Sequence, residues 1–157
     1  MILNNPAELR EAVPEGIRIM GLDVGTKTIG LALSDTRRVI ATPLETIRRR
    51  RFREDIERLL WLIDTHGVGG LVIGLPLTLA GGEGPRTQSV RQFARNVVAL
   101  RDLPLVFWDE RLSTAAVTRE MIAADLTRKR RGAIVDRVAA AYILQGFLDA
   151  TGRASVT

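Results

Sequence analysis

The pattern of apolar and polar residues predicts three short strands at the start of the fold. Two apolar runs, residues 18–24 and 29–34, flank the turn Gly25-Thr26-Lys27-Thr28. This spacing is typical of two antiparallel strands joined by a tight turn. A third apolar run at 39–47 predicts a third strand beside them.

The rest of the chain alternates between helical and strand patterns. Helical spacing of apolar residues predicts a helix over 52–66, and strands are expected at 70–75 and 103–108. A glycine-rich loop at 76–85 precedes a helix at 86–100. Two further helices are expected, from Ser113 or Thr114 through residue 124 and over 132–150, joined by a basic linker at 125–131.

This order of elements predicts the α/β class. An antiparallel meander extended by crossover strands gives a mixed sheet with helices on its faces, in the order βββαβαβα. The 157 residues suffice for one domain. We expect a polar lead at 1–15, the domain at 16–150 and a tail at 151–157.

Composition excludes several classes of chemistry. The chain has no cysteine, so disulfides, thiolate metal sites and cysteine nucleophiles are excluded. Its one histidine, His66, precedes Gly67 at the end of a predicted helix, where a charge favourable to the helix dipole is the simpler interpretation. Any metal site must therefore use oxygen ligands, which favour Mg²⁺ or Mn²⁺.

No apolar stretch is long enough to span a bilayer, and no secretory signal is visible. We therefore expect a cytoplasmic protein without a membrane partner.

The positive charge of the chain comes almost entirely from arginine. The net charge is +5, and the 23 basic residues include only two lysines, Lys27 and Lys129. Arginines cluster at 48–53 and again at 128–137. Guanidinium groups match phosphate oxygens, so the clusters suggest nucleic-acid binding, although a solvated charged face is an equal alternative.

Three carboxylates break the local polarity pattern. Asp23 lies inside the first strand on the same face as Ile17, Ile19 and Gly21, and Glu110 follows an apolar strand. Asp136 shares a helical stripe with small and apolar residues, two of them alanines that would permit close approach to the sheet: Ala139, Ala140, Ile143 and Phe147.

Each carboxylate also has a structural explanation. Asp23 would cap a turn, Glu110 would pair with Arg111, and Asp136 would favour the helix dipole. One mechanism covers all three, because clustered carboxylates can bind two divalent ions roughly 4 Å apart that promote phosphodiester hydrolysis.

The sequence resembles the YqgF-type nucleases. The resemblance covers residues 17–149 and is carried by GLDVGTKTIGLALSD, VIATPLETI, LVIGLPLTLAGGEG, WDERLST and VDRVAAAYILQGFLD. One departure is Thr28, where relatives often have a basic residue.

The resemblance implies a ribonuclease H-like fold with a five-stranded sheet. It also implies a nuclease whose metal-binding acidic site is Asp23, Glu110 and Asp136, and whose substrate is the small-subunit ribosomal RNA precursor or branched DNA. Expected substrate-binding residues are Thr26, Lys27, Arg111, Ser113, Thr114, Arg128, Arg130 and Arg131.

Two other functions remain as alternatives. The Asp-x-Gly-Thr motif at Asp23 also resembles the phosphate loop of actin-like ATPases, but those enzymes have two lobes and this chain has length for one. A non-catalytic RNA-binding assembly factor is the other alternative. The sequence leaves open whether the protein is a monomer or a homodimer.

Overall fold

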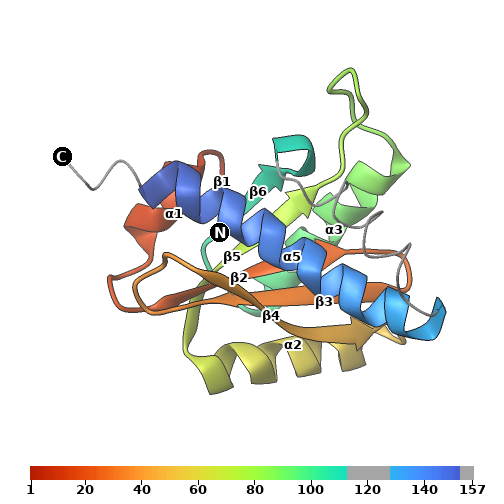
Figure 1. Ribbon diagram of the computed structural model, residues 1–157, viewed down its shortest axis with the longest axis horizontal. Coiled ribbons are helices and arrows are strands. Elements are labelled where there is room, and N and C mark those ends of the chain that lie inside the picture. The colour runs from red at the N-terminus through yellow and green to blue at the C-terminus, as the bar shows by residue number, and fades with distance from the viewer. Residues whose placement is uncertain (113–127, 153–157) are drawn as a thin grey trace.

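The computed structural model describes residues 1–112 and 128–152 (Figure 1). The elements in chain order are β1 (Ile2–Leu3), α1 (Pro6–Ala12), β2 (Arg18–Val24), β3 (Thr28–Ser34), β4 (Ala41–Arg48), α2 (Phe52–His66), β5 (Val68–Leu75), α3 (Pro85–Leu100), β6 (Leu105–Asp109), the 3₁₀ turn η1 (Glu110–Leu112) and α5 (Arg128–Gly152).

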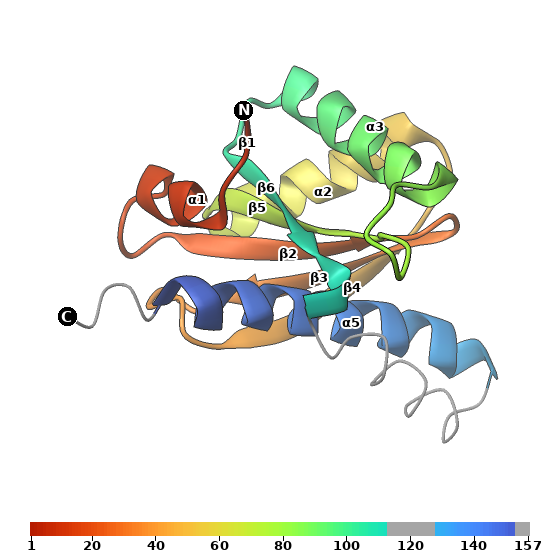
Figure 2. The same cartoon turned by 90° about the horizontal axis from the view of Figure 1, so that it is seen from above.

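The strands form one mixed sheet in the order β1-β6-β5-β2-β3-β4. The strands β2, β3 and β4 are antiparallel neighbours, whereas β1, β6, β5 and β2 run parallel. Figure 2 shows α5 along one face of the sheet and α2 and α3 along the other. The predicted α/β architecture, with helices on both faces, is confirmed.

The described part of the sheet has six strands, so the expected number of five is wrong by one. The extra strand is β1, in which Ile2 pairs in parallel with Leu105 of β6. The helix α1 follows, and its Leu9 is fully buried against the face that carries α5. A strand of two residues is too short to produce a recognisable alternation in the sequence.

Helix α2 occupies residues 52–66 as predicted and ends at Gly67, whose φ of 64° is left-handed. Helix α5 begins at Arg128. The expected end of the basic linker at residue 131 is therefore wrong, because residues 128–131 belong to the helix. Arginine and lysine favour helices, which extends α5 beyond its apolar stripe. The helix expected at 113–124 lies outside the described residues. No described helix has the length and apolar character needed to cross a bilayer.

The packing of α5 on the sheet depends on two glycines. A Cβ at Gly21 would lie 2.7 Å from Leu144 Cβ and 2.9 Å from the carbonyl oxygen of Ala140. A Cβ at Gly30 would overlap the backbone carbonyl of Asp136. The predicted close approach of this helix is therefore confirmed. In contrast, Ile17, expected on the buried face, is 36% exposed because it precedes the strand β2.

Replacing Gly30 with alanine should destabilise the protein by about 3 kcal/mol or more, because the new methyl group meets backbone that cannot rotate away. Gly82→Ala is the matched control, since its nearest neighbour is the Thr78 hydroxyl at 3.2 Å and the position is exposed. Urea unfolding measures both variants. Equal stability of Gly30→Ala and the parent protein would contradict this packing.

Candidate active site

The first carboxylate, Asp23, lies near the carboxyl end of β2 and is half-buried. It pairs with Gly30 of β3. Side chains alternate along a strand, so Asp23 shares the face of Gly21, which α5 covers.

The second carboxylate, Asp136, lies on α5 at the contact with Gly30. Since Gly30 is the cross-strand partner of Asp23, this contact brings the backbone of Asp136 over the strand next to Asp23. The Thr28 hydroxyl donates a hydrogen bond to Asp136 Oδ2. The sequence pattern gave no sign of this bond.

The helix-dipole explanation for Asp136 is weakened by where α5 begins. The helix starts at Arg128, which places Asp136 beyond its first two turns. The dipole effect declines within the first turn. The helix dipole therefore stabilises the charge of Asp136 very little. The half-buried position of this carboxylate needs another explanation.

The third carboxylate, Glu110, begins the turn η1 directly after β6 and is half-buried. The last residue of β6, Asp109, pairs with Leu75 of β5, and β5 also pairs in parallel with β2. The carboxyl ends of these three strands therefore meet at one edge of the sheet. Glu110 and Asp23 lie at this edge with β5 between them, two strand spacings or about 10 Å apart in the direction across the sheet.

Arg111 connects η1 to the glycine-rich loop. Its Nη2 lies 2.7 Å from Asp109 Oδ2, and the hydrogen bond from Arg111 lowers the pKa of Asp109. Its Nη1 donates to the backbone carbonyls of Thr78 and Leu79, at 3.4 and 3.3 Å. The sequence suggested an ion pair of Arg111 with Glu110, whereas the ion pair that the structure shows for Arg111 is with Asp109. Arg111 also fixes the loop beside Glu110.

Two further arginines reach the backbone next to Asp23. Arg49 Nη1 donates to the Gly25 carbonyl at 2.7 Å, and Arg86 Nη2 donates to the Val24 carbonyl at 3.2 Å. Sequence reasoning missed both as residues of this site. Arg49 belongs to the arginine cluster at 48–53, which was a usable signal, whereas nothing distinguished Arg86.

Of the expected substrate-binding residues, Thr26 and Lys27 are exposed in the turn between β2 and β3, where the Gly25 amide donates to the Thr28 carbonyl at 2.8 Å. Ser113 and Thr114 lie outside the described residues. Three more belong to the first turn of α5: Arg128, Arg130 and Arg131.

The donor set suits a hard divalent cation, because all three candidate ligands are carboxylates at one sheet edge. The structure brings Asp136 to the strand beside Asp23 and places Glu110 across β5. Within residues 1–112 and 128–152, no three such side chains are close enough together to form a set of metal ligands.

Replacing Arg111 with glutamine should raise the pKa of Asp109 toward its ordinary value of 3.8, because the hydrogen bond and the charge are both lost. The pKa is depressed in the folded protein, so the pair stabilises the fold above pH 3.8, and this contribution disappears as the pH falls through the folded-state pKa. Carboxyl NMR titration measures the shift. Arg91→Gln, which removes a partner of Glu83, should leave Asp109 unchanged.

Solved structures resemble this fold at low sequence identity. Thermus thermophilus RuvC in complex with a Holliday junction substrate superimposes with a TM-score of 0.54 at 14% identity, covering 87% of this chain and 96% of that chain. The yeast mitochondrial Holliday junction resolvase gives a TM-score of 0.51 at 10% identity, covering 92% and 83%. These similarities confirm the predicted ribonuclease H-like fold.

Curated relatives are much closer in sequence. A protein of Paramagnetospirillum magneticum, provisionally named pre-16S rRNA nuclease, is 60% identical over 144 residues, covering 92% of this chain and 93% of its own. A protein of Rhodospirillum rubrum with the same name is 57% identical, covering 91% and 89%. The family model RuvX, described as Holliday junction resolvase, matches residues 17–150. The expected resemblance is confirmed, and the chain belongs to the RuvX family.

Proposed function

We propose that this protein is a metal-dependent nuclease that hydrolyses phosphodiester bonds in structured nucleic acid. The observation that carries the proposal is the contact of α5 with Gly30, which brings Asp136 to the strand beside Asp23 at the edge where Glu110 follows β6. Membership of the RuvX family and the names of the curated relatives support it.

The three carboxylates have distinct proposed roles. Asp23 and Asp136 bind the divalent cation, and Glu110 binds it or orients the attacking water. Magnesium or manganese, as two ions, would supply an activated water and stabilise the charge on the leaving oxygen. The hydrogen bond from Thr28 fixes the rotamer of Asp136, which limits where this carboxylate can present its other oxygen.

Cationic and polar groups around this edge would contact the substrate backbone. Thr26 and Lys27 are exposed in the turn beside Asp23, and Arg111 borders Glu110. The same contribution is proposed for Ser113, Thr114, Arg128, Arg130 and Arg131 from their positions in the sequence.

The proposed substrate is the precursor of 16S ribosomal RNA, because relatives up to 60% identical carry that name. Cleavage of four-way DNA junctions is the second candidate, which the family description favours. Resolving a junction requires two cuts, so this candidate also predicts a homodimer on the substrate. Cleavage of both substrates by one preparation, with light scattering on the junction, decides between them.

Asp136→Asn should lower the cleavage rate about 100-fold or more, because a metal ligand loses its charge. Asp149→Asn is the matched control, since Asp149 lies on the exposed side of the same helix and pairs with Gln145. Relief of carboxylate repulsion should raise the melting temperature of metal-free Asp136→Asn.

Cleavage of labelled precursor RNA is measured with Mg²⁺, with Mn²⁺ and after chelation. Chelator should abolish cleavage, and added metal should restore it. Full activity of Asp136→Asn, or full activity after exhaustive chelation, would refute the proposed mechanism. Unchanged RNA binding without cleavage under any metal would instead support the assembly-factor alternative.

Substrate binding should weaken steeply with salt. Contacts with about six phosphates lower the affinity roughly a thousandfold between 50 and 200 mM salt. Removing the arginines of the first turn of α5 should reduce the slope of log affinity against log salt by about 0.9 for each phosphate that is no longer bound. The variant is Arg128/Arg130/Arg131→Ala, and the control with equal charge loss is Arg91/Arg95/Arg101→Ala on and just after α3. Equal slopes for the two variants would show that the α5 cluster does not bind the substrate.

A further inference from the structure

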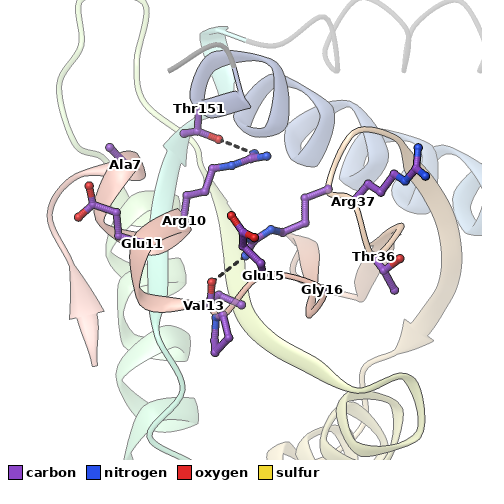
Figure 3. Close-up of a pocket in the computed structure, with 11 residues that line it drawn as sticks. Ala7, Arg10, Glu11, Val13, Glu15, Gly16, Thr36, Arg37 and Thr151 are labelled. Carbon is purple, nitrogen blue, oxygen red and sulfur yellow. Dashed lines mark hydrogen bonds between the residues drawn. The ribbon is translucent and has the colours of Figure 1, made fainter. Parts of the chain in front are cut away.

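Figure 3 shows the lining of a cavity of about 740 Å³. The cavity lies beside the start of β2, and Asp23 lies near the other end of this strand. It is lined by residues of α1, of the segment leading into β2, of the turn between β3 and β4, and by Thr151 near the end of α5. Its volume lies within the range of small-molecule sites. None of the three candidate carboxylates lines it.

Arg38 is an unusual residue in the wall of this cavity. It is only 5% exposed, and its φ of 58° places it in the left-handed region. Residues other than glycine are uncommon in that region, and its backbone strain is often retained at functional sites. Arg38 Nη1 donates to the Val13 carbonyl at 2.9 Å, which orients the guanidinium against the segment before β2.

Arg10 adds a second guanidinium to the same cavity. Its Nη1 donates to Thr151 Oγ1 at 3.2 Å, and Figure 3 shows Arg10 extended toward Thr151. Burial lowers the pKa of Arg38, and the charge of Arg10 lowers it further, while Glu15 opposes the shift. The two cations are thus close enough to repel one another.

The charges of the two arginines are not neutralised by an ion pair. Among the described residues, no carboxylate oxygen lies within 4 Å of the guanidinium of Arg10 or Arg38. The lining includes two carboxylates, Glu11 and Glu15, both exposed. Within the described part of the chain, Arg38 is thus buried with no ion pair within 4 Å, and only the more distant charge of Glu15 compensates it. Burying a charge with so little compensation is costly. A bound anion would offset that cost and the repulsion together.

We propose that this cavity binds a phosphate group, with Arg10 and Arg38 as the donors. Guanidinium groups match phosphate oxygens with pairs of parallel hydrogen bonds. The phosphate comes either from a free anion or nucleotide, or from a nucleic acid that extends past the catalytic edge. The site is separate from the carboxylates, so it stands independently of the proposed nuclease activity.

Isothermal titration calorimetry with inorganic phosphate and pyrophosphate tests the site, in chelator and at constant ionic strength. Arg10→Gln and Arg38→Gln should each weaken binding about tenfold, as expected for the loss of a charge-assisted hydrogen bond. The control Arg95→Gln removes an equal charge from the exposed face of α3 and should leave binding unchanged. Arg10 is only partly buried, so its variant remains informative if Arg38→Gln does not fold.

A second titration uses a short RNA duplex and Asp23→Asn protein, which separates this site from cleavage. Weakened binding of phosphate alone in the Arg10 and Arg38 variants assigns the cavity to a free anion. Weakened binding of RNA as well assigns it to the nucleic-acid backbone. Affinities equal to those of the parent protein for both probes, or no phosphate binding by the parent protein, would overturn the proposal. Asp23→Asn should abolish cleavage and retain phosphate binding, so the failure of either proposal is visible by itself.

Discussion

Helix α5 can contact the sheet closely because Gly21 and Gly30 have no side chains at the point of contact. Backbone meets backbone at Gly30, so the helix has almost no freedom to shift toward or away from β3. Small residues on the helix, Ala139 and Ala140, complete this close packing and are almost fully buried. The position of Asp136 is therefore set by packing in the core as well as by its own hydrogen bond.

The sheet edge completes the arrangement, because parallel strands end together there. Asp23 belongs to β2, and Glu110 follows β6, two strands away. Arg111 contacts the loop after β5 through the carbonyls of Thr78 and Leu79, so the segments that follow β5 and β6 are joined to one another. Arg49 donates a hydrogen bond to the Gly25 carbonyl, and Arg86 donates one to the Val24 carbonyl. The candidate site is thus surrounded by arginines that bind backbone oxygens.

Periodicity predicts the elements well where an apolar face is long. The alternation over 18–24 and the helical spacing over 52–66 match β2 and α2 at both ends. The prediction from periodicity fails where the sequence has no repeating apolar pattern. The strand β1 has only two residues, and the start of α5 is charged. Likewise, the candidate carboxylates stand out as polar residues on apolar faces. Contacts such as Thr28 with Asp136, or Arg86 with Val24, join residues far apart in sequence, and a one-dimensional pattern does not contain them.

The pairing of β1 with β6 has a consequence for how the chain acquires its structure. Ile2 pairs with Leu105, so this parallel ladder closes a loop of about a hundred residues. Such long-range pairing is slow to form compared with local hairpins. During synthesis the hairpin β2–β3 can form early, whereas Ile2 and Leu3 must wait until β6 has left the ribosome. The first strand in the chain is therefore among the last to find its partner.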